Sequence, residues 1–125
     1  MLTDADIREA LRACYDASHP FRQPMNIVDL GLIEIIALAL DPNAPGAGIA
    51  GVAPRQSLAL TLIPASPDED AQTQLRAQIL NRLAGLDGLS AVCVCFAAAP
   101  VWNTARISPE GRRLLALDFP ILNNR

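Results

Sequence analysis

Residues 26–40, NIVDLGLIEIIALAL, begin as a polar turn and continue as an apolar strand, and the rest of the chain can be placed around this change. Asn26 and Asp29 favour a turn, because their side chains bond nearby backbone N–H groups. Gly31 permits backbone angles that Leu or Ile resists. Residues 32–40 are rich in Ile, Leu and Ala and carry a single charge. This composition predicts a largely buried strand.

The spacing of apolar residues elsewhere predicts three helices and two further strands. We expect the first helix to begin at Thr3 and to end by Ser18–Pro20, the second to run from Pro67 to about Ala84, and the third from Pro109 to Leu117. The two further strands are expected at Ser57–Ile63 and Ser90–Ala97. The first two strands should pair antiparallel. The crossover through the second helix should make the third strand pair parallel or lie nearby in the same sheet, with a right-handed connection. The predicted fold is α+β, a small two-layer sandwich in the order α-β-β-α-β-α with a three-stranded mixed sheet covered by helices.

Several helix positions can be assigned individually. Thr3 and Asp6 have the spacing of a capping box, and we expect Ile7, Leu11, Cys14 and Tyr15 to share the buried face of the first helix.

The second helix has an equally strong start signal. Ser66 is the expected N-cap, Pro67 the first helical residue, and Glu69 the third.

Length and composition limit the class of protein. The 125 residues predict one domain over 1–125, in which residues 41–56 form a probable flexible loop and residues 119–125 a loose tail. The net charge of −3 argues against a nucleic-acid partner. No apolar run is long enough to cross a membrane. Three cysteines, an odd number, and an acidic N-terminus predict a cytoplasmic protein without a disulfide framework.

The cysteines and the single histidine are the candidate metal ligands. Cys14 is expected in the core, and His19 in a proline-containing loop has a mainly structural interpretation. Cys93 and Cys95 share one face of a strand, and we expect them to be structural, buried thiols. A metal site at this pair stays open as an alternative, but it requires two further ligands that the sequence does not identify.

Residues 24–33, PMNIVDLGLI, resemble the signature of the PaaD-like and SufT-like iron–sulfur cluster assembly domains. The resemblance continues at Thr61-Leu62, along residues 92–96, at Pro100-Val101-Trp102 and at Arg106-Ile107-Ser108, and it spans nearly the whole chain. It agrees with the predicted fold, and it makes residues 41–56 an insertion with a possible lid or partner-binding role. One departure is central: where the family has a cysteine ahead of a proline, this chain has Ser66.

The sequence offers no nucleophile–base pair, no second histidine and no glycine-rich phosphate loop, so we expect a protein-binding factor and not an enzyme. The functional surface that the resemblance implies contains Asp29, Thr61, Ser66, Trp102, Thr104 and Arg106. A cysteine at a helix start offers a thiolate to iron, whereas a serine caps the helix. We therefore expect an iron–sulfur assembly or maturation accessory factor that holds no cofactor, with a transient cluster implied by the resemblance alone. Its partners would be the assembly machinery or a client apoprotein, and a homodimer is possible.

A second hypothesis is a diverged, non-enzymatic interaction module that keeps the fold and not the iron chemistry. The departure at Ser66 favours this second hypothesis, and the intact motif at residues 26–33 favours the first.

Overall fold

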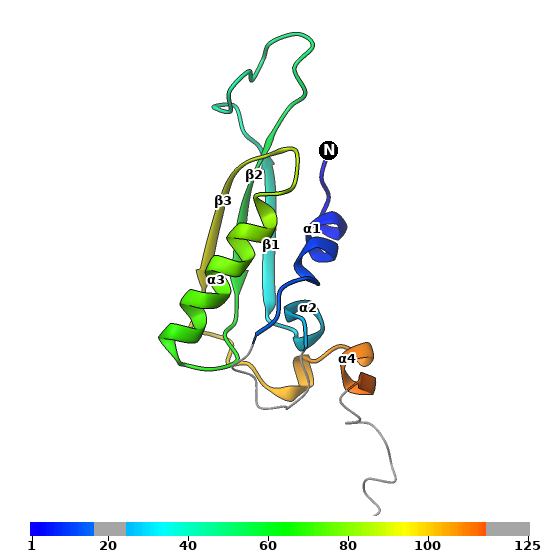
Figure 1. Ribbon diagram of the computed structural model, residues 1–125, viewed down its shortest axis with the longest axis vertical. Coiled ribbons are helices and arrows are strands. Elements are labelled where there is room, and N and C mark those ends of the chain that lie inside the picture. Colours follow the sequence, from blue (N-terminus) through cyan, green and yellow to red (C-terminus); the bar gives the residue numbers. More distant parts are fainter. Residues whose placement is uncertain (17–24, 115–125) are drawn as a thin grey trace, which may run out of the picture.

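The computed structural model describes residues 1–16 and 25–114 of the chain (Figure 1). The elements are α1 (Asp4–Leu11), α2 (Ile27–Leu30), β1 (Ile33–Leu40), β2 (Gln56–Leu62), α3 (Glu69–Leu83), β3 (Leu89–Phe96), the 3-10 helix η1 (Thr104–Arg106) and α4 (Pro109–Leu114). The predicted α+β class and element order are confirmed, and a one-turn helix, α2, is added where a polar turn was expected.

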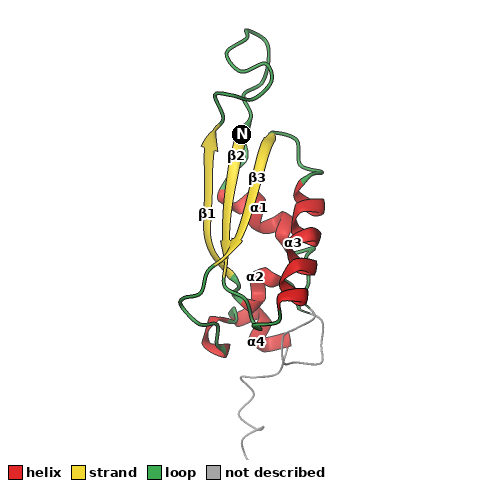
Figure 2. Ribbon diagram, turned by 90° about the vertical axis from the view of Figure 1, so that its left-hand side faces the viewer, coloured by secondary structure: helices red, strands yellow, loops and turns green. Residues whose placement is uncertain are grey.

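The three strands form one mixed sheet in the order β1-β2-β3. β1 and β2 pair antiparallel, with Leu38 opposite Leu58, and β2 and β3 pair parallel, with Leu60 opposite Val94. Both pairings agree with the sequence prediction. Helices α1 and α3 lie on one side of the sheet, which gives two layers, and α2 and α4 lie at its lower end (Figure 2).

The core lies between the sheet and helices α1 and α3. Leu58, Leu60 and Leu62 alternate along β2 and are at most 2% exposed, as their period of two predicts. On α3, Leu75, Ile79 and Leu83 form a buried stripe at helical spacing. Ile7, Leu11 and Cys14 close the core from the N-terminal side.

The first helix is shorter than its apolar pattern predicts. Thr3 and Asp6 form the expected capping box, but α1 ends at Leu11 and not near Ser18. Tyr15 therefore lies beyond the helix and is 48% exposed, so its predicted place on the buried face is wrong. The side-chain amide of Gln78 binds both backbone polar groups of Tyr15, and these bonds direct the chain away from helical geometry.

The prediction that β1 is largely buried is also wrong. Ile35 and Leu40 are 52% and 58% exposed, and only Ile33 at the start of the strand is buried. The reason is that β1 is an edge strand whose outward side chains are not covered by any described helix. An apolar sequence alone does not distinguish this position from a central strand.

The side of the sheet that faces away from the helices is called the open face here. The strand register assigns nine outward residues to it, namely Ile35, Ala37 and Ala39 of β1, Ser57, Ala59 and Thr61 of β2, and Ala91, Cys93 and Cys95 of β3. Each of these residues is exposed or half-buried.

Residues 41–55 form a series of turns that projects from the end of the sheet opposite to α2 and α4 (Figure 1). Their predicted flexibility stays a prediction. The predictions for His19, for the end of the last helix beyond Leu114 and for the tail 119–125 concern residues outside the described part of the chain.

Candidate functional site

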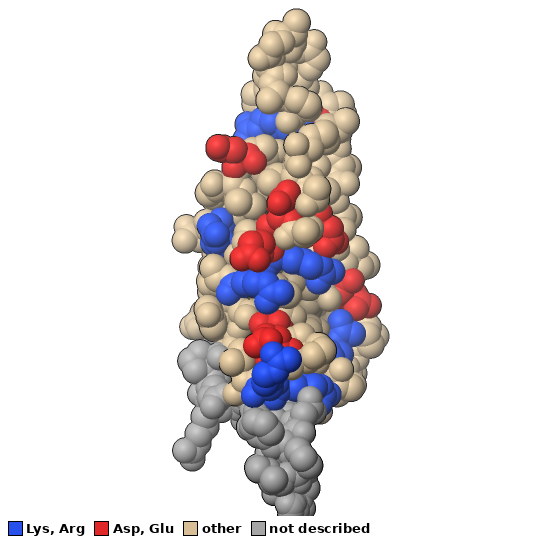
Figure 3. Space-filling view, turned by 90° about the vertical axis from the view of Figure 1, so that its right-hand side faces the viewer, with Lys and Arg blue, Asp and Glu red and all other residues tan. Residues whose placement is uncertain are grey.

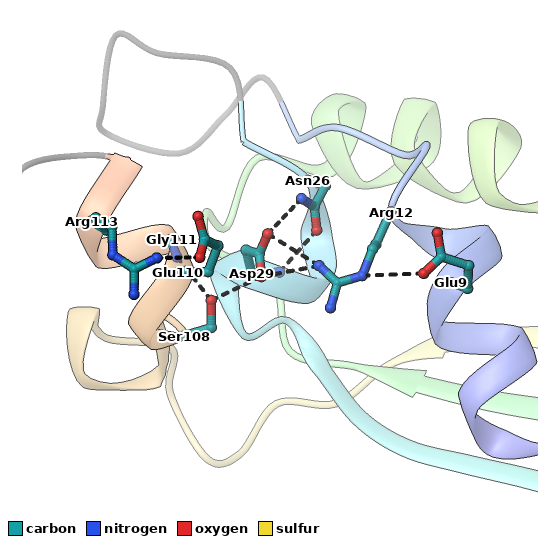
Figure 4. A network of polar contacts seen from close by, with 8 residues as sticks. All are labelled: Glu9, Arg12, Asn26, Asp29, Ser108, Glu110, Gly111 and Arg113. Carbon is teal, nitrogen blue, oxygen red and sulfur yellow. Dashed lines mark hydrogen bonds and ion pairs between the residues drawn. The ribbon is translucent and has the colours of Figure 1, made fainter.

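The carboxylate of Asp29 joins three segments that are far apart in the sequence (Figure 4). It accepts hydrogen bonds from Asn26 Nδ2 and Ser108 Oγ, both at 2.8 Å, and from Arg12 Nη1, at 3.2 Å to each carboxylate oxygen. Asn26 Oδ1 in return caps α2 by accepting the Asp29 backbone N–H. We call Arg12, Asn26, Asp29 and Ser108 the Asp29 cluster.

The cluster keeps the Asp29 carboxylate ionised although its residue is only 5% exposed. Burial by itself raises the pKa of Asp29, but the hydrogen bonds from Asn26, Ser108 and Arg12, with the charge of Arg12, hold that pKa below its usual value. Every oxygen lone pair that faces the protein is therefore used in binding neighbouring segments. The arrangement suits a structural carboxylate and not an acid or base that exchanges protons with a substrate.

A second set of bonds fastens the loop after β3 to the start of β1. Trp102 Nε1 donates to the Leu30 carbonyl at 2.7 Å, and Arg106 Nε donates to the Gly31 carbonyl at 2.8 Å. Arg106 also forms an ion pair with Glu34 at 3.0 Å. Residues 102–108 are thus held in place by residues 29–34.

The approach of these two segments explains the glycine in the motif. Gly31 has φ of +79°, and a Cβ built there would lie 2.0 Å from the Arg106 carbonyl oxygen. Both the positive φ and the close contact exclude other residues. Gly31 is therefore needed at this position to let the Trp102 loop pack against α2.

The fixed loop forms one wall of an open pocket of 560 Å³ at the end of the sheet opposite to residues 41–55. Its lining residues are Ile63, Pro64, Ala65, Ser66, Pro67, Gln72, Phe96, Ala97, Ala98, Pro100, Val101 and Trp102. We call this the Trp102 pocket. Its lining contains no ionisable side chain, and its polar side-chain groups come chiefly from Ser66 and Gln72, so it is suited to binding an apolar group and not to acid–base chemistry.

Ser66 lies in the wall of this pocket but does not cap α3 as predicted. The N-cap is Asp68, whose side chain accepts the Asp70 backbone N–H at 3.0 Å. Ser66 Oγ instead accepts the Asp68 backbone N–H at 3.1 Å, two residues earlier. The stretch offers two capping residues of similar strength, and the second one starts the helix here. The structure also brings Gln72 Nε2 to the Ser66 carbonyl.

The prediction that Cys93 and Cys95 are buried is wrong. Both thiols are exposed on the open face, because the strand alternation directs Val94 and not the cysteines toward the helices. Cys14 is buried as predicted, and its burial raises the pKa of the thiol, opposed by the charge of Arg82. Within residues 1–16 and 25–114, no group of three or more His, Cys, Asp or Glu side chains is placed to hold a metal ion.

The six residues of the predicted surface thus separate into four locations. Ser66 and Trp102 line the pocket, while Asp29 and Arg106 fasten the segments that support it. Thr104 is exposed on η1, and Thr61 lies on the open face opposite Cys95.

Sequence reasoning missed Gln72, Phe96 and Arg12. No local pattern links Gln72 and Phe96 to the loops that complete the pocket, or Arg12 to Asp29, because these contacts join separate elements.

On the side that carries α1, α2 and α4, acidic and basic side chains are mixed along the long axis (Figure 3). The ion pairs of these helices and the neighbouring strand include Arg8–Asp4, Arg12–Asp29 and Arg113–Glu110. This face therefore does not offer the clustered positive charge that nucleic acids require. No helix in the described part of the chain is long and apolar enough to cross a membrane.

Solved structures with this fold include a domain of unknown function, DUF59, from Bacillus anthracis. It has a TM-score of 0.65 and 17% identity, and the match covers 91% of this chain and 92% of that one. Another is the conserved hypothetical protein TM0487 from Thermotoga maritima, with a TM-score of 0.63, 19% identity, and coverage of 90% and 93%. The chain matches no protein-family model and no curated protein. At these identities the likeness extends to the fold.

Proposed function

We propose that this chain is a non-catalytic accessory factor in iron–sulfur cluster assembly or maturation, which binds a protein through the Trp102 pocket and holds no cluster itself. The observation that carries the proposal is the apolar Trp102 pocket, and Ser66 in its wall, where the resembled family has a cysteine ahead of a proline, supports only the part that no cluster is held. A serine hydroxyl is a poor ligand for iron, whereas a thiolate is a good one. The fold supports the resemblance, since DUF59 domains are the family that includes PaaD-like and SufT-like proteins.

The lining of the pocket supports a protein as the ligand. Val101 is 77% exposed at its rim, and Trp102 and Phe96 supply half-buried aromatic surface. Exposed apolar residues beside a fixed tryptophan are typical of the centre of a protein interface. An apolar side chain of an assembly protein or of a client apoprotein would enter the pocket between these residues.

Anaerobic loading with iron and sulfide tests the loss of the ligand at position 66. The measurement compares Ser66 with Ser66→Cys in a chain whose Cys93 and Cys95 are changed to serine, so that position 66 supplies the variable thiol. A small thiol is added to supply the other cluster ligands, because position 66 gives only one thiolate per chain, and we expect visible absorbance and bound iron in Ser66→Cys alone. Thr73→Cys, an exposed position on α3, is the matched control for an added thiol. Equal uptake in all three chains would contradict a cluster site at position 66.

Transfer of a cluster from a scaffold protein to an apoprotein tests the pocket itself. We expect Val101→Glu to reduce any acceleration by this chain about tenfold or more, because the charge must be desolvated at the interface. Ile49→Glu is the matched control, since Ile49 is 61% exposed but lies in the loop at the other end of the sheet. Equal effects of the two substitutions would refute a role for the pocket.

The second candidate function is an interaction module that keeps the fold without iron chemistry. Ser66 favours it, because the residue forms a turn with Asp68 and leaves no thiol in the pocket. This candidate predicts that Ser66→Cys takes up no cluster and that the wild-type chain does not change the rate of transfer. The two experiments therefore separate the candidates.

A further inference from the structure

The open face of the sheet carries two exposed thiols that the Trp102 pocket does not use. Cys93 and Cys95 point outward from β3, opposite Ala59 and Thr61 of β2. The charge nearest in sequence to the open face is Glu34, which pairs with Arg106 at the end of β1. A pair of exposed soft ligands thus lies on a face made of small, uncharged side chains.

The two thiols can reach one metal ion. Residues two apart in a strand have Cα atoms about 6.6 Å apart, and sulfurs around one Zn²⁺ lie about 3.8 Å apart for Zn–S bonds of about 2.3 Å. Each sulfur must lean about 1.4 Å along the strand, which a χ1 rotation can supply. Tetrahedral Zn²⁺ needs four ligands, and among residues 1–16 and 25–114 no third His, Cys, Asp or Glu side chain joins this pair, so the described part of one chain supplies half of a site.

A second copy of the same face supplies the other half. In a two-fold contact each chain presents the same surface, so the Cys93–Cys95 pair of one copy faces that of the other. Sheets joined through a shared ion must approach more closely than the usual separation of about 10 Å. The neighbouring Ala37, Ala59 and Ala91 are small enough to permit this approach. A tetrahedral arrangement requires the two β3 strands to cross at nearly a right angle, one of the two common sheet packings.

The area of the face indicates that the contact depends on the metal. Three strands about 4.8 Å apart and about 23 Å long present a plane of roughly 300 Å². A stable interface buries about 800 Å² on each partner. The open face alone is therefore too small for a stable dimer, and four thiolate–metal bonds would provide the missing stabilisation.

We propose that two copies of this chain bind each other through their open faces and hold one Zn²⁺-like ion with Cys93 and Cys95 of both copies. Binding displaces the thiol protons to solvent and involves no oxidation. This site is on the other side of the sheet from the helices and does not depend on the proposed function of the pocket.

The test is sedimentation of the full chain, reduced and freed of metal, before and after addition of Zn²⁺. We expect a monomer that becomes a dimer with one Zn²⁺ per two chains. Added Co²⁺ should give the charge-transfer absorbance of tetrahedral thiolate coordination. Cys93→Ser should weaken Zn²⁺ binding about 100-fold or more, because it removes two of four ligands from the dimer. Cys14→Ala, which changes a buried thiol outside the face, should leave binding unchanged.

The substitution Ala59→Arg tests the contact between the two chains without changing either metal-binding cysteine. It places a charge in the middle of the contact, and we expect it to keep the chain monomeric and to abolish Co²⁺ absorbance. One Zn²⁺ per monomer, a dimer that forms equally well without metal or without Cys93, or a wild-type chain that binds no Zn²⁺ would each overturn the proposal. A monomer that captures a different protein on this face would overturn it as well.

Discussion

The substitution Asp29→Asn tests whether the Asp29 cluster holds the supporting segments together through a charge. The asparagine has nearly the same shape but one oxygen in place of two, and its amide nitrogen would face a donor, either Asn26 Nδ2 or Ser108 Oγ. We expect the fold to persist with a lower free energy of unfolding. The residue is only 5% exposed, so water cannot replace the lost partners.

The magnitude follows from the bonds that are lost. Hydrogen bonds to a charged group contribute about 1.5–3 kcal/mol each, and the asparagine retains one of the two short ones in a weaker, neutral form. The Arg12 ion pair adds about 1 kcal/mol or less, because the Arg12 side chain is 44% exposed and its charge is screened. We therefore expect a loss of about 3 kcal/mol at pH 7.

The assay is urea unfolding at pH 7 and at lower pH. With an m-value of about 1.5 kcal/mol/M, the midpoint of Asp29→Asn should fall by about 2 M. The pKa of Asp29 is depressed in the folded state, so its contribution is present above the unfolded pKa of about 3.9 and is lost as the pH falls through the folded pKa. The gap between wild type and variant should therefore narrow below about pH 4.

The control is Asp4→Asn, which changes a carboxylate that is 57% exposed and paired with Arg8. It should cost less than about 0.5 kcal/mol. A loss below about 1 kcal/mol for Asp29→Asn, or a gap that stays constant from pH 7 to pH 3, would refute the role of the charge. A constant gap would mean that the shape and not the ionisation of Asp29 stabilises the cluster.

Three further predictions concern the loop contacts beside the pocket and the hydrophobic core. Gly31→Ala should lower the free energy of unfolding by about 2 kcal/mol or more, since its Cβ would lie 2.0 Å from the Arg106 carbonyl oxygen at φ of +79°; thermal unfolding that matches wild type would contradict this. Trp102→Phe should cost about 1 kcal/mol through the bond to Leu30 and should increase amide exchange in the following loop, and unchanged exchange would argue against the bond. Leu60→Ala, at a fully buried site, should cost about 2–5 kcal/mol in urea unfolding, and a loss under 1 kcal/mol would place Leu60 outside the core.

Local patterns in the sequence determined the elements and their pairing. The alternation around Leu60 identified the central strand, and the stripe through Ile79 identified the helix that covers it. The crossover through α3 then favoured parallel pairing, because the helix returns the chain to the end of the sheet where β2 begins. The capping box of Thr3 and Asp6 was also predicted correctly, because a cap depends only on residues within one turn.

The tertiary structure decided which surfaces are covered and which distant residues meet. β1 is apolar yet exposed because it lies at the edge of the sheet, and Cys93 and Cys95 are outward because the helices cover the opposite side. Arg12 and Asp29 lie 17 residues apart, and Ser108 lies 79 residues from Asp29, so no local pattern predicts their contact. Burial and long-range polar contacts depend on how the elements pack, and a sequence period records only which residues share a face.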